Sequence, residues 1–394
     1  MVLRCVGNGS GLNHAGEARR VQELLEELLK WLHRHPETGL HEHETTLHLR
    51  EMLEARGIEV LPSGLPTGLI AVIRGSGEGR TIGLRADIDA LPVQEESGLP
   101  WAPENPGCMH ACGHDFHAAC IMGAALMLHE RRSEWRGTVK VVFQPAEEID
   151  QGGQLIMQTG LVDDCELFLA GHTSAGMPVG MLGVKEGPVM AAVDRFAVTL
   201  RGSGCHAAHP HKGVDPIPAM AAMVQALQTI VSRSMDPFAP RLVSITHAEA
   251  GSTWNVIPET AFFEGTIRTL DASDRALAER RFREIVEGTA AAHGVTAEIG
   301  WTHGSPAVVN DAALCALARE VAARCGMKTC RQENTMGAED FSRYMQGRPG
   351  MFVRIGTGGT YPAHHPRFTV DPQALYPAAC FFAELALNCL RMEA

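Results

Sequence analysis

The spacing of apolar side chains changes along the chain between the two periods of regular secondary structure. From Val21 to Leu32 they recur every three or four residues and Pro36 ends the pattern, which predicts an amphipathic helix. A second helix is predicted over residues 44–57, with Gly57 as its C-terminal stop. Apolar runs then predict strands and intervening helices at residues 69–73, 81–84, 116–131 (helix), 138–143, 154–158 (helix) and 167–170. This alternation favours an α/β sheet domain with helices on both faces.

The pattern changes at about Gly187. Strand, helix, strand, strand, helix and strand follow in that order, at residues 196–200, 218–232, 242–248, 262–270, 275–293 and 295–301. A βαββαβ order is typical of a compact ferredoxin-like unit. The α/β rhythm then resumes with a helix capped by Asp311, a strand at residues 351–355 and a final helix near residues 374–390. We therefore predict a discontinuous larger domain, residues 1–186 and 302–394, into which residues 187–301 are inserted.

Composition and charge exclude several classes of protein. The chain has 394 residues, enough for one large domain and a smaller one. Its 34 Lys and Arg against 46 Asp and Glu give a net charge of -12 without a basic cluster, so no nucleic-acid partner is expected. Apolar stretches such as residues 118–128 are too short to span a membrane, and residues 1–16 do not resemble a signal peptide. The sequence predicts a soluble, cytoplasmic protein.

The 11 cysteines and 19 histidines direct attention to metal sites. The cysteines are scattered without the dense spacing of a disulfide scaffold, so most are expected to be buried thiols. In the segment Met109-His-Ala-Cys-Gly-His-Asp-Phe-His117, Cys112 and His114 stand two residues apart. The segment lies between strand-like and helix-like sequence, where α/β sheets place ligand sites. Taken alone, the pair fits a buried thiol and a helix-capping imidazole as well as it fits two metal ligands.

Polar residues also follow other predicted strands. Glu147 and Glu148 come directly after one strand, where one carboxylate can bind metal while the other handles a proton, although a solvated acidic turn is the simpler alternative. His172 follows the strand at residues 167–170, and His364 follows a later strand. Each histidine alone is more readily explained as structural. Because the strand ends of one sheet converge in space, the four clusters together predict a shared site.

Eight segments of the chain resemble the aminoacylase and hippurate hydrolase family of binuclear metallopeptidases, which includes the indoleacetyl-amino-acid hydrolases. They lie at residues 84–92, 109–117, 144–148, 187–191, 206–211, 255–259, 337–341 and 364–368. The resemblance covers nearly the whole chain, and the joint order of the segments is highly specific. It implies a zinc-peptidase-like catalytic domain, an inserted dimerisation domain, and hydrolysis of the amide bond of N-acyl amino acids with an acetyl, benzoyl or aryl-acetyl group.

The resemblance also implies the roles of single residues. Five of them are implied metal ligands, namely Cys112, His114, Glu148, His172 and His364. The Cys112 thiolate would bridge two divalent ions, and thiolate, imidazole and carboxylate together suit Zn²⁺, Mn²⁺, Co²⁺ or Ni²⁺. Glu147 matches the general base, which takes a proton from metal-bound water. Asp89 matches a carboxylate that orients a ligand, although a strand-end cap is an equal alternative.

Three residues of the inserted domain match substrate-contacting positions of the family. His206 matches a histidine that stabilises the tetrahedral oxyanion, and Asn255 and Arg268 match positions at the substrate end, with Arg268 as a carboxylate clamp or an ordinary surface residue. Relatives pair through this domain, which implies a homodimer or a dimer of dimers. Whether His206 serves its own subunit or the neighbouring one stays open.

The chain departs from the family pattern at three places. Thr173-Ser-Ala-Gly176 stands where relatives carry a bulkier loop, Cys205 stands where glycine is usual, and Asp371-Pro372 replaces an acidic pair. Every implied ligand is present, so catalytic competence is expected. Three alternatives stay open: a dipeptidase or carboxypeptidase that uses the same centre, a thiol-nucleophile hydrolase built on Cys112 and His114, and a metal-dependent binding protein that has lost catalysis.

Overall fold

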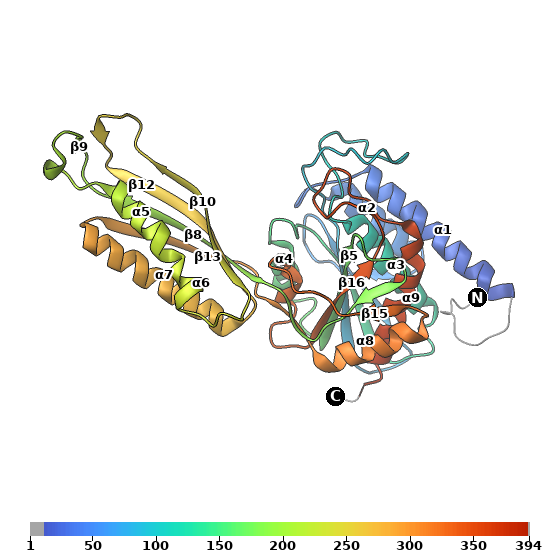
Figure 1. Cartoon of the computed structure of the whole chain (residues 1–394). Coiled ribbons are helices and arrows are strands. Elements are labelled where there is room, and N and C mark those ends of the chain that lie inside the picture. Colours follow the sequence, from blue (N-terminus) through green and yellow to red (C-terminus); the bar gives the residue numbers. More distant parts are fainter. Residues whose placement is uncertain (1–11, 393–394) are drawn as a thin grey trace. The chain divides into compact units, whose positions relative to one another are not determined.

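The computed structural model describes residues 12–392, with the side chains of residues 12–15 and 17 left aside. Residues 1–11, where no signal peptide is expected, lie outside the described residues. The chain forms two compact units (Figure 1). The first unit contains the described residues up to 187, residues 309–333 and those from 340 onward, and the second contains residues 188–308 and 334–339. We describe each unit by itself.

The first unit is built on an eight-stranded sheet. Its strands, in spatial order, are β1 (Glu59–Val60), β2 (Leu69–Arg74), β4 (Thr138–Gln144), β3 (Thr81–Asp87), β5 (Leu167–Ser174), β16 (Gly350–Gly356), β6 (Met181–Gly183) and β15 (Lys328–Cys330). The strands expected from the apolar runs are confirmed as β2, β3, β4, β5 and β16. β6 and β15 were not expected, because three-residue strands leave no readable alternation. Since β4, β3, β5 and β16 run parallel, their carboxyl ends meet at one edge.

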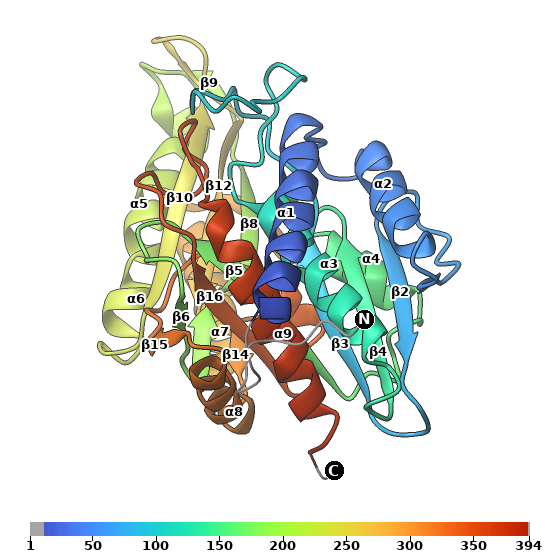
Figure 2. The ribbon, with the colours of Figure 1, turned by 90° about the vertical axis from the view of Figure 1, so that its right-hand side faces the viewer.

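Helices lie on both faces of this sheet, as expected, with α1 (Leu12–Arg34), α3 (His114–Glu130) and α9 (Leu375–Cys389) on one face and the shorter α4 (Gly152–Gln158) and 3-10 helix η2 (Asp340–Arg343) on the other. α1, α3 and α9 pack together, and Figure 2 shows them side by side. A Cβ on Gly171 of β5 would lie 2.8 Å from the ring of Phe382 in α9. Phe168, on the opposite face of β5, contacts Tyr344, which follows the 3-10 helix η2 (Asp340–Arg343).

The first unit has three further helices, α2 (His43–Glu54), α4 (Gly152–Gln158) and α8 (Ala312–Arg324). α2 ends at Glu54, three residues before the expected stop at Gly57, while Asp311 caps α8 as expected by accepting a bond from the Leu314 N–H. Two short strands, β7 (Gly187–Met190) and β14 (Val308–Asn310), stand where the chain passes between the units. α3 is buried on all sides from its first residue to Leu128, which makes it a rigid support for the residues at its N-terminus.

The second unit is a four-stranded antiparallel sheet with helices on one face. Its strands, in spatial order, are β10 (Arg241–Ala250), β12 (Thr260–Thr269), β8 (Ala192–Arg201) and β13 (Thr296–His303). Its helices are α5 (Pro216–Leu227), α6 (Thr229–Arg233) and α7 (Ala272–His293). In β8, Phe196, Val198 and Leu200 are buried and alternate with more exposed residues, so only one face of the sheet is covered. The single helix expected at residues 218–232 is divided between α5 and α6.

Three smaller features complete the fold. A two-stranded sheet pairs β9 (Cys205–His206) with β11 (Val256–Ile257) in the second unit. All 10 cysteines in the described part of the chain are free thiols, and six of them are buried, as expected; Cys5 lies outside it. Within residues 12–392, no helix is both long enough and apolar enough to cross a membrane.

Candidate metal centre

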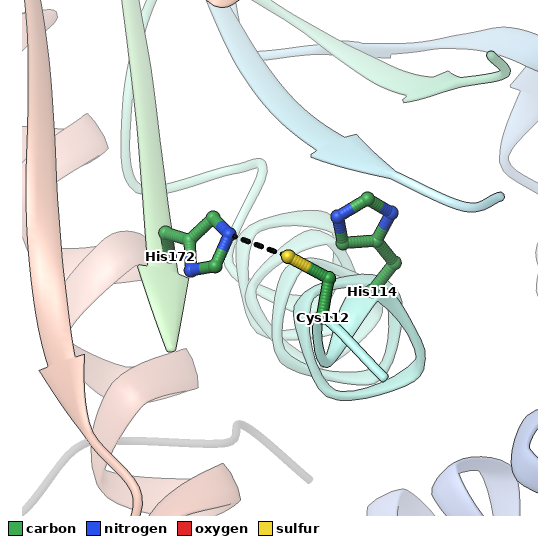
Figure 3. Close-up of side chains that lie close together, drawn as sticks. All are labelled: Cys112, His114 and His172. Carbon is green, nitrogen blue, oxygen red and sulfur yellow. Dashed lines mark hydrogen bonds between the residues drawn. The ribbon is translucent and has the colours of Figure 1, made fainter. Parts of the chain in front are cut away.

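The candidate centre lies at the edge where the parallel strands of the first unit end. Cys112 and His114 flank Gly113, which caps the N-terminus of α3 with a left-handed φ of 85°. His172 lies near the C-terminal end of β5, and its side chain points at the start of α3 (Figure 3). The ligand atoms of these three residues all lie within 4.8 Å of one another, and Cys112 Sγ is 3.2 Å from His172 Nε2. All three side chains are buried.

Two further triplets share atoms with the first. Cys112, Glu148 and His364 form one, and His114, Glu147 and Glu148 form the other, each with ligand atoms within 4.8 Å. Glu148 Oε1 lies 3.3 Å from His364 Nε2 and 3.9 Å from His114 Nε2. The structure therefore brings all five sequence-predicted ligands and Glu147 into one cluster. Cys112, His114 and Glu148 each belong to two of these three triplets, so the triplets form one connected group.

Hydrogen bonds orient two of the imidazoles toward this cluster. His114 Nδ1 is 3.1 Å from Asp89 Oδ1, while Asp89 Oδ2 accepts the backbone N–H of Glu148 at 2.9 Å. His172 Nδ1 lies 2.8 Å from the carbonyl oxygen of Thr173, to which it donates. Because a proton on Nδ1 leaves Nε2 with its lone pair, both rings present a metal-binding nitrogen. Asp89 thus joins one ring to the loop that carries Glu147 and Glu148.

The electrostatics of the cluster favour a cation. Burial lowers the pKa of His114, but the charge of Asp87 and neighbouring hydrogen bonds outweigh it and hold this pKa well above its usual value. Hydrogen bonds with Cys112 and Glu148 raise the pKa of His364 to about 10. The same negative groups that hold protons here would also attract a divalent ion, which would displace those protons.

The donor atoms fit such an ion. His114 Nε2 is buried and has no hydrogen-bond partner among residues 12–392. Buried polar atoms are nearly always satisfied, so an unpartnered imidazole nitrogen 3.9 Å from a carboxylate oxygen of Glu148 fits a site for a positive ion. A set of one thiolate sulfur, imidazole nitrogens and carboxylate oxygens suits Zn²⁺, Mn²⁺, Co²⁺ or Ni²⁺.

Two polar residues beside the centre were missed by the sequence reasoning. Asp87 and His117 have polar atoms within 4.8 Å of a ring nitrogen of His114. These atoms, however, already form hydrogen bonds with other residues. Asp87 accepts hydrogen bonds from Arg85 at 2.7 Å and from His117 Nδ1 at 2.5 Å. They support the centre rather than add ligands to it. Asp87 stands two residues before Asp89, and His117 stands three residues after His114. This spacing was the signal in the sequence that could have identified them.

The turn that carries Glu147 is held from outside the sheet. Ala146, with a left-handed φ of 55°, donates its backbone N–H to Glu42 Oε1 at 2.8 Å. Glu42 is fully buried at the start of α2. Glu147 itself is half-buried and stands next to Glu148, so two carboxylates project from adjacent residues of this turn.

The residues expected at the substrate end lie in the second unit. His206 on β9 is the Cα partner of Val256 on β11, and the N–H of Ala207 donates to the carbonyl of Asn255 at 3.0 Å. His206 and Asn255 are therefore neighbours. Arg268 lies on β12 in the four-stranded sheet and borders a hollow of about 350 Å³.

Comparisons with known proteins find relatives that match most of the chain. An N-acetylcysteine deacetylase of Bacillus subtilis is 46% identical over 360 residues, which are 91% of this chain and 95% of that protein. A thermostable carboxypeptidase of Saccharolobus solfataricus is 34% identical over 94% of this chain and 97% of its own length.

A crystal structure and a family model give the same result over most of the chain. The structure of a Bacillus subtilis protein, described as a dinuclear metal-binding peptidase of the M20 family, matches with a TM-score of 0.87 and 42% identity. The match covers 95% of this chain and 100% of that one. The model of peptidase family M20/M25/M40 matches residues 83–388. The chain therefore belongs to peptidase family M20/M25/M40.

Proposed function

We propose that this protein is a metal-dependent amidohydrolase that cleaves the amide bond of N-acyl amino acids. The observation that carries the proposal is the single cluster in which Cys112 takes part in two candidate triplets and Glu147 stands beside Glu148. The 46% identity to an N-acetylcysteine deacetylase supports an N-acyl amino acid as substrate. Two divalent ions would be held by Cys112, His114, Glu148, His172 and His364, as the similarity to a dinuclear metal-binding peptidase supports.

The bound ions would make water nucleophilic near neutral pH and polarise the amide carbonyl. Glu147 accepts the proton that this water gives up and passes it to the leaving amine nitrogen. Asp89 keeps the proton of His114 on Nδ1, so that Nε2 stays available as a ligand. No side-chain nucleophile is required, and Cys112 acts as a ligand rather than as an attacking group.

The second unit would complete the substrate site and the assembly. His206 would stabilise the tetrahedral oxyanion, Asn255 would contact the substrate, and Arg268 would bind its carboxylate through forked donors. The strand order β13, β8, β12, β10 and the alternation with helices support a ferredoxin-like inserted domain, which we place at residues 187–301. Its uncovered sheet face and edge would serve pairing into a homodimer or a dimer of dimers.

The main alternative is a dipeptidase or carboxypeptidase that uses the same centre, which the 34% identity to a thermostable carboxypeptidase supports. A panel of N-acetyl, N-benzoyl and aryl-acetyl amino acids, assayed beside free dipeptides with Zn²⁺, Mn²⁺, Co²⁺ and Ni²⁺ in turn, separates the two. Faster turnover of free dipeptides with every ion would reject the amidohydrolase assignment. A thiol hydrolase predicts the opposite pattern of inhibition, with activity lost on alkylation and retained after chelation.

The roles of the two adjacent carboxylates provide the sharpest test of the mechanism. Glu147→Gln keeps shape and hydrogen bonding but removes the proton acceptor, so we expect full metal content and a rate loss of about a hundredfold to ten-thousandfold. Glu148→Gln should instead lose bound metal. Metal content by elemental analysis and kcat on an N-acetyl amino acid are measured on the same preparations. Reversed phenotypes would mean that base and ligand are exchanged.

A further inference from the structure

We propose that Thr173 is a positioning residue that holds Cys112 and His172 at the spacing a binuclear centre needs. The inference rests on the proposed metal site and adds a residue to it. Thr173 follows His172 at the end of β5 and is 4% exposed. It contacts both ligands, although the two are 60 positions apart in the chain.

The hydroxyl of Thr173 reaches the two ligand residues at once. Its Oγ1 donates to the carbonyl oxygen of Cys112 at 2.9 Å, because a carbonyl can only accept. The same Oγ1 lies 3.3 Å from His172 Nδ1, and the Thr173 carbonyl accepts from that nitrogen at 2.8 Å. The proton of His172 is therefore kept on Nδ1, and Nε2 faces Cys112 Sγ with its lone pair.

A buried chain of charges fixes the backbone of Thr173 from the other side. Its N–H donates to His117 Nε2 at 2.8 Å, so this nitrogen must accept and the His117 proton must be on Nδ1. His117 Nδ1 in turn donates to Asp87, which also accepts from Arg85. His117, Asp87 and Arg85 are each no more than 2% exposed. Thr173 thus cannot shift without breaking a bond to a buried and otherwise satisfied group.

Close packing restricts Thr173 further. A Cβ on Gly113 would lie 2.8 Å from both Oγ1 and Cγ2 of Thr173, closer than real Cβ atoms approach. Gly113 also has the left-handed φ of 85° that turns the chain from Cys112 into α3. The glycine at the turn and the threonine beside it therefore fit each other, and the threonine methyl fills the space that the missing side chain leaves.

The hydroxyl can be separated from the packing by two substitutions. Thr173→Val keeps the shape but removes the donor to Cys112 and the second acceptor for His172. Thr173→Ser keeps the hydroxyl and removes only the methyl group. Thr159→Val is the matched control, because Thr159 also donates its hydroxyl to a carbonyl, that of Ile156 at 2.7 Å, but lies at the end of α4.

The experiment measures metal binding directly, in the full chain. Zn²⁺ and Co²⁺ dissociation constants come from competition with a chromophoric chelator, the Co²⁺ absorption spectrum reports thiolate ligation, and the unfolding temperature of each metal-free variant reports folding. Groups that orient metal ligands typically contribute about tenfold to a hundredfold in affinity. We expect a loss of that size and an altered Co²⁺ spectrum for Thr173→Val, a change below about threefold for Thr173→Ser, and none for Thr159→Val.

Two results would overturn the inference. Wild-type Zn²⁺ affinity and an unchanged Co²⁺ spectrum in Thr173→Val would show that the hydroxyl does not position the ligands. A loss in Thr173→Ser as large as that in Thr173→Val would show that the site responds to any change of this side chain and not specifically to the hydroxyl, which would also refute it. A wild-type chain that binds neither Zn²⁺ nor Co²⁺ would instead reject the proposed metal centre itself, so the two failures are distinguishable.

Discussion

His33 is expected to be a buried cation that ties α1 to the segment that carries the candidate ligands. The residue is 5% exposed, with Nδ1 2.7 Å from Asp115 Oδ2 and Nε2 3.0 Å from Glu95 Oε2. Burial lowers the pKa of His33, but the hydrogen bonds and charges of Asp115 and Glu95 outweigh it and raise this pKa to about 10. Asp115 follows His114 directly, so the pair connects helix α1 to the start of α3.

The raised pKa of His33 has a defined consequence for stability. The folded state holds the His33 proton more tightly than the unfolded chain, whose histidine pKa is 6.5. The stabilisation is therefore complete below pH 6.5 and is lost as the pH rises through about 10. At about 1.4 kcal/mol per pH unit, this interval sets an upper limit on the order of 5 kcal/mol.

Replacement of His33 tests this directly. His33→Gln leaves Asp115 and Glu95 buried without their cation, and removal of one partner of a buried ion pair costs about 3–5 kcal/mol. We expect a loss of that size in the free energy of unfolding at pH 7. The loss shrinks by up to about 3 kcal/mol at pH 9.5, because above pH 6.5 only the folded wild type still binds the proton, and binding it contributes less stability as the pH rises towards the folded pKa of about 10. Urea unfolding of the metal-free protein, followed by tryptophan fluorescence, gives both values. His41→Gln, at an exposed histidine, is the control. A difference between wild type and His33→Gln that is equal at both pH values would refute a charged His33.

Three further predictions concern the centre and the assembly. Cys112→Ser should lose metal and turnover together, because serine cannot supply a soft thiolate at neutral pH, whereas the control Cys325→Ser should lose neither. Full metal content in Cys112→Ser, measured by elemental analysis, would contradict a bridging thiolate. Chelation should abolish amide hydrolysis and lower the unfolding temperature, and added Zn²⁺ or Mn²⁺ should restore both; activity that persists in metal-free protein would exclude metal catalysis. Exchange of Glu147→Gln subunits with His206→Ala subunits should restore activity towards half of wild type per mixed dimer if His206 serves the neighbouring subunit, and an inactive mixture with proven exchange would refute that arrangement.

The fold could be predicted where the sequence pattern is long. The longer helices that carry a regular apolar stripe, and the strands β2 to β5 that contain apolar runs, were expected close to their observed positions. The elements that the sequence pattern did not predict are short. β6 and β15 extend the sheet with three residues each, and their place depends on pairing with β16 and with each other rather than on their own sequence.

The residue types of the candidate site could be predicted from the sequence, but the hydrogen bonds that hold those residues in place could not. Cys112, His114 and Glu148 are of types that bind metal and follow strands that converge, so the sequence alone raises the hypothesis. The bond from His117 to Asp87 joins residues 30 positions apart, and the bond from His117 to Thr173 joins residues 56 positions apart. A pairing of that kind depends on how β3, α3 and β5 pack, for which a single sequence carries no local signal.

Backbone strain explains why local rules fail at this edge of the sheet. The non-glycine residues with left-handed φ in the described chain are Leu40, Ala146, Asp150 and His364, and all lie in the first unit. Ala146 precedes Glu147, Asp150 ends the same turn, and His364 belongs to the candidate cluster itself. Such a conformation costs roughly 1–2 kcal/mol per residue and persists only where the surroundings determine it. The buried helix α3 and the parallel strands supply those rigid surroundings, so the ordinary preferences hold in the core and are overridden where ligands must converge.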